Sequence, residues 1–198
     1  MADVVQIQLQ TASAASKWGK AAFTPTATGF QIHLNAADAQ RSVQKAARSL
    51  DGLGLTQLQL SGDNWTLELQ WAFYQGFCSA KKQTGVQFCG DTATITQLEQ
   101  LARCFSWAKQ LINQTPDELY PEQLAKQAAA FINSVAAAGT VSSHILLDEQ
   151  LLAQGWHGLH AVGRGSARKP AMLLLDYNPT GDRNAPVVAA LVGKGITF

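Results

Sequence analysis

The chain has 198 residues, of which 46% are hydrophobic, and this is enough apolar material to bury a globular core of one or two domains. Lysine and arginine total 15 against 14 acidic residues, so composition provides no basic surface for nucleic acid or for an anionic membrane. No apolar run reaches the roughly 18 residues of a membrane span, and the amino terminus lacks the features of a signal peptide.

The cysteines are odd in number and form no Cys-x-x-Cys pair, which argues against a disulfide framework and against a zinc ribbon. Free cysteines of this kind are typical of a reducing compartment. We therefore expect a cytoplasmic protein that binds neither nucleic acid nor membranes.

Three strands are predicted in the first part of the chain, at residues 5–9, 30–34 and 58–60. Between the second and third, apolar residues follow helical spacing, with Asn35 or Asp38 able to cap the start and Gly52 placed as the cap glycine at the end. Residues 65–77 fit both strand and helix periodicity, so periodicity alone leaves that segment open.

A strand at residues 86–88 is followed by apolar positions from Ile95 to Ile112 that predict an amphipathic helix of about five turns. Thr94 with Gln97, or Thr96 with Glu99, would supply a capping box for its start. A further helix is predicted to begin at Pro121, because proline suits the first turn, and to end by Gly139.

Strands are predicted in the last part of the chain at residues 141–146, 172–176 and 186–192. Helices alternate with strands, which favours an α/β fold with a mostly parallel sheet in the second half and a domain boundary at the long helix.

The chain ends with a predicted buried strand that leads into Gly193-Lys194-Gly195-Ile196-Thr197-Phe198. A phosphate-binding P-loop would need a glycine where Val188 stands and Ser or Thr where Gly195 stands, so that motif is excluded. The dinucleotide fingerprint also fails, because Phe198 here, and Arg168 in the stretch from Gly163, replace its third glycine.

This ending resembles the start of the signature of the leucyl-aminopeptidase family. The resemblance extends upstream through residues 158–166, Pro170, 175–182 and 113–124. Residues 46–54 and 71–76 resemble one bacterial branch of that family, in which the amino-terminal domain is shorter. The similarity covers nearly the whole chain, and the first 25 or so residues are the least distinctive part. It also favours a helix over residues 65–77.

The resemblance implies an α/β fold in three parts: a small amino-terminal α/β domain (1–92), a long connecting helix (93–115) and the beginning of an α/β catalytic domain with a mostly parallel sheet (116–198). It also implies a cytosolic aminopeptidase that removes amino-terminal residues from peptides, uses two divalent metal ions (manganese, zinc or cobalt) and assembles into homohexamers.

By the same resemblance, the amine of Lys194 binds one of the two metals, and no other metal ligand, catalytic residue or cofactor-binding residue falls within this chain. A lysine binds metal only as the neutral amine, so a dication must displace its proton. With one such ligand, we expect the 198-residue segment alone to be metal-free and inactive. The ordinary interpretation of a Gly-Lys-Gly sequence is a solvated lysine in a turn.

Two further groups of side chains are candidate metal or anion sites. His157 and His160 are three residues apart and would share a helix face as metal ligands, but we favour surface or capping histidines. Arg164, Arg168 and Lys169 would bind an anion, but a solvated loop is the stronger interpretation.

His33 and His144 fall on predicted strands and are interpreted as packing or surface residues. The cysteines, Cys78, Cys89 and Cys104, lie near phenylalanines and are interpreted as buried thiols rather than nucleophiles. The alternative function is a stand-alone interaction or regulatory module. A nucleic-acid binder is a weaker form of that alternative, since the chain carries almost no net charge.

Overall fold

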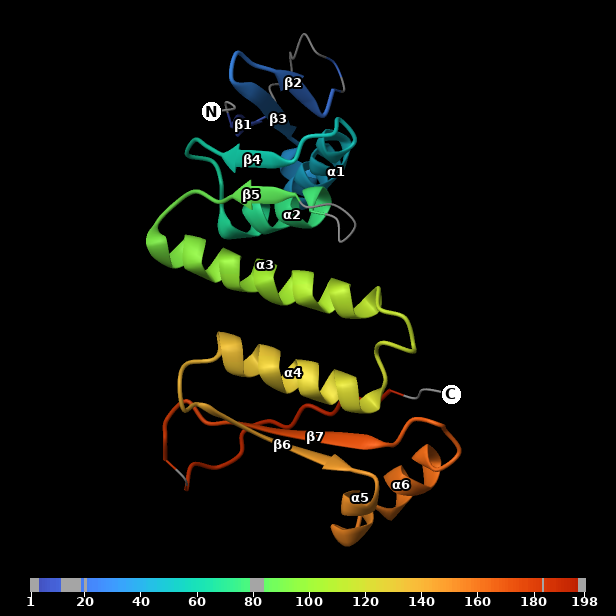
Figure 1. The fold of residues 1–198 in the computed structure, drawn as a ribbon. Helices are drawn as coiled ribbons and strands as arrows, with labels where there is room; N and C mark the ends of the chain where they lie inside the picture. The colour runs from blue at the N-terminus through green and yellow to red at the C-terminus, as the bar shows by residue number, and fades with distance from the viewer. Residues whose placement is uncertain (1–3, 12–18, 20, 79–83, 183, 196–198) are drawn as a thin grey trace. The chain divides into compact units, whose positions relative to one another are not determined.

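The computed structural model describes residues 4–11, 19, 21–78, 84–182 and 184–195. It divides into two compact units, Met1–Gln110 (unit 1) and Leu111–Phe198 (unit 2), which are described separately (Figure 1). No helix in the described part of the chain is long and apolar enough to cross a membrane.

Unit 1 contains a five-stranded sheet in the order β2-β3-β1-β4-β5. Its strands are β1 (Val5–Thr11), β2 (Phe23–Pro25), β3 (Gly29–Leu34), β4 (Gln57–Leu60) and β5 (Gly85–Gln87). The pairs β1–β3, β1–β4 and β4–β5 are parallel, and only the edge pair β2–β3 is antiparallel. The strands predicted around residues 5–9, 30–34, 58–60 and 86–88 are therefore present, whereas β2 was not predicted.

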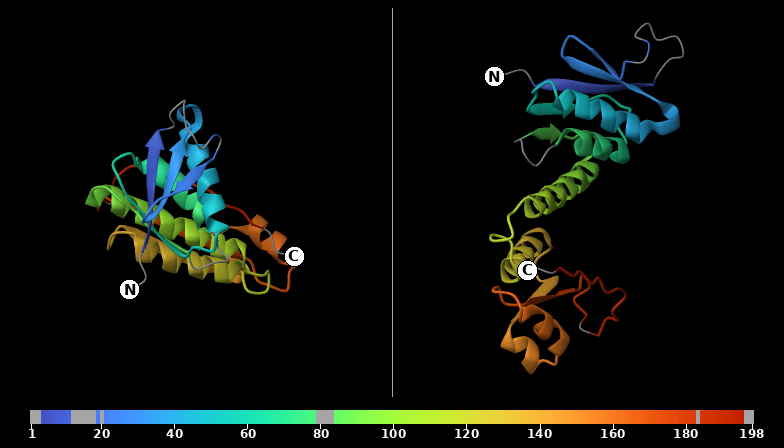
Figure 2. Two further views of the ribbon diagram at one scale, coloured as in Figure 1. Left: turned by 90° about the horizontal axis from the view of Figure 1, so that it is seen from above. Right: turned by 90° about the vertical axis from the view of Figure 1, so that its right-hand side faces the viewer.

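Two helices cover one face of this sheet: α1 (Ala39–Asp51) and α2 (Leu67–Phe77) (Figure 2). A short 3₁₀ turn, Ala36–Asp38, precedes α1, and Asn35 caps that turn by accepting from the amide of Ala37 at 3.1 Å. The segment with ambiguous periodicity is thus a helix over Leu67–Phe77, and the hydroxyl of Thr66 caps its start by accepting from the amide of Leu69 at 3.3 Å.

The alternating apolar residues of the strands pack against these helices in one core. Ile7, Ile32 and Leu58 on the sheet, and Val43, Leu50, Phe73 and Phe77 on the helices, are all inaccessible to solvent. The ring of Phe73 lies edge-on to that of Trp65, with 5.7 Å between centroids. Since a buried phenylalanine contributes about 3 kcal/mol or more, this cluster is the main source of stability in unit 1.

The long helix α3 (Thr92–Ile112) packs on α2 within unit 1. The hydroxyl of Tyr74 lies 2.7 Å from that of Ser106, and the amine of Lys109 donates to the carbonyl of Cys78 at 3.0 Å. The start of α3 differs from the prediction: the amide of Thr94 donates to the Asp91 carboxylate at 2.7 Å, so an aspartate caps the helix and neither predicted capping box is used.

Unit 2 contains α4 (Pro121–Val135), β6 (Val141–Leu147), α5 (Glu149–Ala153), α6 (His157–Gly163) and β7 (Ala171–Tyr177). The helix α4 starts at Pro121 as predicted but ends four residues before Gly139, which lies in a turn with φ of 76°. Strands β6 and β7 pair antiparallel, and α4 contacts both of them (Figure 1).

The α/β class is confirmed, but the mostly parallel sheet lies in unit 1, whereas the two described strands of unit 2 are antiparallel. Gly52 does not adopt the left-handed conformation that is usual for a cap glycine. Gly52 does end α1, yet its φ is −63°, which any residue adopts, and the left-handed glycine of this turn is Gly54 with φ of 79°.

Candidate functional site

Lys194, the one metal ligand predicted from the resemblance, lies on an exposed segment without regular structure. The preceding residues 186–192 were predicted as a buried strand, and this prediction is wrong for the described structure, since no strand is formed there. Val188 is 94% exposed and Leu191 is fully exposed. A strand forms only where its backbone finds a neighbouring strand, and within the described residues neither β6 nor β7 pairs with this segment.

A metal centre at Lys194 would need further ligands, so we asked which of the described side chains could bind an ion together. Among them, a single group of at least three histidine, cysteine or carboxylate side chains has ligand atoms close enough to share an ion, and it consists of Asp148, Glu149 and His160. Lys194 is not a member of that group, and no ion pair joins its amine to another of the described residues. The described residues thus fit one ligand of a two-metal centre and do not complete it.

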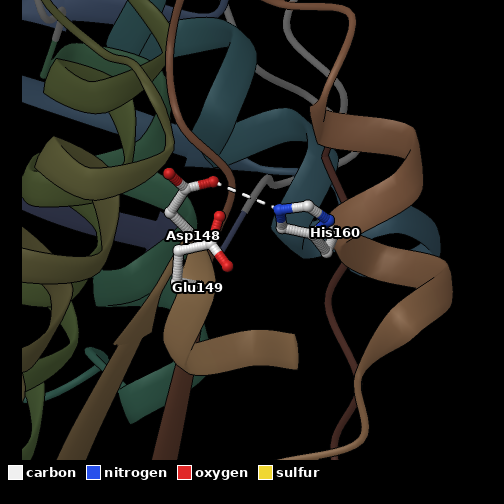
Figure 3. Close-up of side chains that lie close together, drawn as sticks. All are labelled: Asp148, Glu149 and His160. Atoms are coloured by element: carbon white, nitrogen blue, oxygen red, sulfur yellow. Dashed lines mark ion pairs between the residues drawn. The ribbon is translucent and has the colours of Figure 1, made fainter. Parts of the chain in front are cut away.

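The carboxylate–histidine group brings together three elements of unit 2 (Figure 3). Asp148 follows the last residue of β6, Glu149 begins α5, and His160 lies in α6. The Nε2 atom of His160 is 3.4 Å from Oδ1 of Asp148, and the possible ligand atoms of all three side chains lie within 4.8 Å of one another.

Lys169 already provides this group with a cation. Its amine is 2.8 Å from Oδ2 of Asp148, and this hydrogen bond, together with the positive charge, holds the pKa of the Asp148 carboxyl below its ordinary value. The pKa of Lys169 is raised by the same contact. The positive charge of Lys169 balances the negative charge of Asp148. The group is therefore best described as an ion-pair network in which Asp148, at the end of β6, contacts His160 of α6 and Lys169.

The two histidines that were considered together lie on the same helix but differ in burial and in contacts. His160 is partly buried and contacts Asp148, whereas His157 is exposed and does not belong to the group. The sequence offered no signal for the Asp148 contact, because twelve positions and the α5 turn separate the two residues.

Two of the basic residues before Pro170, Arg168 and Lys169, contact carboxylates, and Arg168 also contacts an aromatic ring. Arg168 lies 3.8 Å from the Asp117 carboxylate, and its guanidinium stacks over the Tyr120 ring with 4.6 Å to the centroid. Since Arg168 and Lys169 each face an acidic side chain, the loop does not concentrate free positive charge for an anion.

The predicted burial of the three cysteines holds only in part. Cys78 is buried and Cys89 is half-buried, and burial raises the pKa of both thiols, which opposes a role as thiolate nucleophile. The expectation of burial is wrong for Cys104, which is exposed because it lies on a side of α3 that packs against nothing in the described part of unit 1. His33 is partly buried beside Thr24 at 3.1 Å, and His144 is exposed on β6.

Two known families match successive parts of the chain. Residues 6–92 match a family described as "Peptidase", and residues 106–198 match the catalytic domain of the cytosol aminopeptidase family. The second part of the chain is therefore similar to the catalytic domain of that family, and the first part is similar to a domain described only as a peptidase.

Over its whole length the chain is similar to peptidase B. It is 47% identical over 200 residues to peptidase B of Vibrio parahaemolyticus serotype O3:K6 (strain RIMD 2210633), and 46% identical to that of Vibrio atlanticus (strain LGP32). Each alignment covers 100% of this chain and 46% of the relative, so the chain spans about half the length of the curated relatives it matches.

Solved structures of low sequence identity share the fold. The bottromycin maturation enzyme BotP in complex with Mn has a TM-score of 0.66 at 21% identity, covering 91% of this chain and 46% of that one. The cytosol aminopeptidase of Coxiella burnetii has a TM-score of 0.62 at 14% identity, with 88% and 44% coverage. These likenesses establish the α/β fold of the chain.

Proposed function

We propose that the full-length protein is a two-metal aminopeptidase that removes amino-terminal residues from peptides, and that this chain supplies its amino-terminal domain and the beginning of its catalytic domain. The observation that carries the proposal is the 47% identity to peptidase B along the entire chain, combined with the catalytic-domain match over residues 106–198.

The division of the chain into residues 1–92, a connecting helix at 93–115 and a catalytic portion from 116 is part of this proposal. The two family matches support it, because they meet between residues 92 and 106, inside α3. The compact units themselves divide near the other end of that helix, at Gln110 and Leu111, so the helix packs mainly with the amino-terminal unit.

We assign Lys194 as a ligand to one of two divalent ions, with manganese, zinc and cobalt as candidates. Its side chain is exposed and stands between two glycines, which leaves the amine accessible to an ion. Bound divalent ions would supply Lewis-acid activation of the scissile carbonyl and of the attacking water. The contribution of this chain is one neutral amine, so the segment alone is expected to be metal-free and inactive.

The proposal extends to assembly and location. A homohexamer in the cytoplasm is expected from the family, and the free cysteines and the lack of a membrane-spanning helix among the described residues agree with such a location. Peptides are the proposed substrates of the full-length protein.

The test compares the 198-residue chain with a chain extended by the second half of a curated relative. Hydrolysis of leucine p-nitroanilide is measured with added manganese, zinc or cobalt, and metal binding is followed by calorimetry. We expect activity only in the extended chain, and we expect Lys194→Ala and Lys194→Arg to remove most of it and to weaken metal binding, because neither side chain offers a neutral amine.

Lys126→Ala provides the matched control, since Lys126 is an exposed lysine of unit 2 whose partner is Glu122, its neighbour one turn away on α4. It should leave rate and metal affinity unchanged. Activity in the 198-residue chain itself, or full activity in both Lys194 variants, would show that the active site has been misplaced.

The alternative of a stand-alone interaction or nucleic-acid-binding module is not supported by these comparisons, which lead to peptidases throughout. A salt-dependent shift of labelled duplex DNA at physiological ionic strength would revive it.

A further inference from the structure

Within the described part of unit 1, α1 and α2 cover one face of the sheet, and no described helix lies over the other face (Figure 2). The buried residues of β1, β3 and β4 pack in one cluster with those of α1 and α2. Since side chains alternate along a strand, the residues between them project from the opposite face. Six of these form what we call the amide face: Gln6, Gln8, Gln10, Gln31, Gln59 and Gln87.

The strand register makes the amide face continuous. Gln8 pairs with Gln31 across β1 and β3. Gln6 pairs with Gln59, which in turn pairs with Gln87, so that one row of three amides crosses β1, β4 and β5. Paired residues on one face have Cβ atoms about 4.5–5.5 Å apart, so the amides form a single surface over four neighbouring strands.

The composition of this face is unusual for a surface in water. Its other positions within the described strands are Gly29, Gly85, His33 and Gln57, together with Thr24, which is buried beside His33; none of them is lysine, arginine, aspartate or glutamate. Exposed surface normally carries charged residues of both signs. Among the described strands, this face offers no cations and no stacking aromatic rings to nucleic acid, and no large apolar side chains to a lipid surface.

The amide side chains are also available for contact. Two members, Gln10 and Gln87, are exposed, and the other four are partly exposed: Gln6, Gln8, Gln31 and Gln59. Within the described part of the chain, no hydrogen bond is recorded for the side chain of any member of the amide face. A glutamine amide offers two donor hydrogens and two acceptor lone pairs, so each one carries its full hydrogen-bonding capacity to the surface.

We propose that the amide face binds the amide face of a second copy of this chain. A two-fold interface places the same surface on both partners, and therefore the surface has to be complementary to itself. Lysines or glutamates near the axis would face their own copies and repel, whereas an amide both donates and accepts and so pairs with its own kind. The amide-rich composition, without lysine, arginine, aspartate or glutamate among the described strands, meets this condition of electrostatic complementarity.

Amide contacts are individually weak, so the contact is a reversible, low-affinity dimer that strengthens a larger assembly rather than a permanent dimer. Because no charges take part, the association constant changes little with ionic strength. This inference does not depend on aminopeptidase activity.

Sedimentation velocity of the 198-residue chain over concentrations up to the millimolar range tests the proposal. We expect a concentration-dependent dimer. The double variant Gln8→Lys/Gln59→Lys places like charges on both partners and should raise the dissociation constant at least tenfold. Mixing it with Gln8→Glu/Gln59→Glu should restore a heterodimer, since opposite charges then meet across the interface.

Gln97→Lys/Gln100→Lys is the matched control, because both glutamines are exposed on α3 and the change in charge is the same. It should leave the dimer intact. Circular dichroism and the thermal midpoint show that each variant is folded. A chain that stays monomeric throughout, or a dimer that is indifferent to the amide-face lysines and is therefore held by another surface, would overturn the proposal.

Discussion

The two units of the chain bury their apolar residues to different degrees. In unit 1 a parallel sheet and two helices enclose seventeen buried residues in one cluster. In unit 2, the described apolar side chains that are buried are few, namely Ala125, Ala129, Leu146 and Leu151, while Val162, Tyr177 and Leu191 are 66%, 67% and 100% exposed. The comparison shows that the five-stranded sheet of unit 1 with its two helices buries more apolar side chains than the two-stranded sheet of unit 2 with its helices.

The largest expected effect is on the core of unit 1. Phe73→Ala removes a side chain that is fully buried between Trp65 and Phe77, and it should lower the free energy of unfolding of unit 1 by about 3–5 kcal/mol. Hydrogen exchange followed by mass spectrometry would report this separately for each unit. An equal loss of protection in unit 2 would show that the two units unfold together, and the comparison would then fail.

A smaller effect is expected where α1 and α2 cross. A Cβ atom at Gly76 would lie 2.9 Å from Cβ of Ala47 and would collide with the carbonyl of Gln44. Alanine gains up to about 1 kcal/mol in helix propensity, but the overpacking costs about 1–3 kcal/mol, so Gly76→Ala should be destabilising.

Gly158 of α6 is the matched glycine in unit 2, because a Cβ built there meets nothing within 4 Å. Gly158→Ala should therefore be neutral or slightly stabilising, by a few tenths of a kcal/mol. Thermal unfolding of both variants measures the contrast, and a stabilising Gly76→Ala would mean that the helices are not in close contact.

The ion-pair network of unit 2 should give that unit its own pH dependence. The hydrogen bond and charge of Lys169 lower the pKa of Asp148 in the folded state, so this contribution to stability is complete above the unfolded pKa and is lost as pH falls through the folded pKa. The raised pKa of Lys169 acts in the opposite range, and its contribution is lost as pH rises through the folded value.

Lys169→Met should thus flatten the stability of unit 2 in acid and in alkali, with a small effect because the pair is accessible to solvent. Urea unfolding between pH 3 and pH 7 measures the acid limb. Lys45→Met, on the exposed side of α1, serves as the control and should leave the profile unchanged. A wild-type profile in the Lys169 variant would mean that the contact does not persist in solution.

The smallest effect is expected in the exposed segment before Lys194. Val188→Ser and Leu191→Ser should each change the free energy of unfolding of the 198-residue chain by less than about 0.5 kcal/mol, because both side chains are already in water. Thermal unfolding measures this change. Losses comparable to that of a core residue would indicate that the segment is buried in solution, and would weaken the contrast between the units.

Local patterns predicted much of unit 1. The apolar spacing of Val43 and Leu50 is sufficient for α1, and the glutamine–apolar alternation is sufficient for β1, because each of these elements has one buried face. Local patterns did not predict β2, since three residues that include Pro25 carry no periodicity. They also placed the start of α3 three residues late, because Asp91, Thr94 and Thr96 are all acceptable capping residues and tertiary packing selects among them.

Contacts between distant residues could not be predicted. Gln70 is completely buried, and its side chain bonds both the amide and the carbonyl of Cys89 at 2.9 Å, which fastens α2 to the segment after β5. A glutamine in a helix is ordinarily solvated, so nothing in the pattern distinguished it. The contact of His160 with Asp148 was missed for the same reason.

The sequence by itself determined the α/β class, the positions of most helices and strands, and the resemblance to a peptidase family, because these depend on residue order and local periodicity. Only the tertiary structure decided which sheet is parallel, that residues 186–192 form no strand, and which carboxylates meet His160 and Arg168. Strand pairing and ion pairing depend on which groups the fold brings within about 3–4 Å, and no local pattern contains that information.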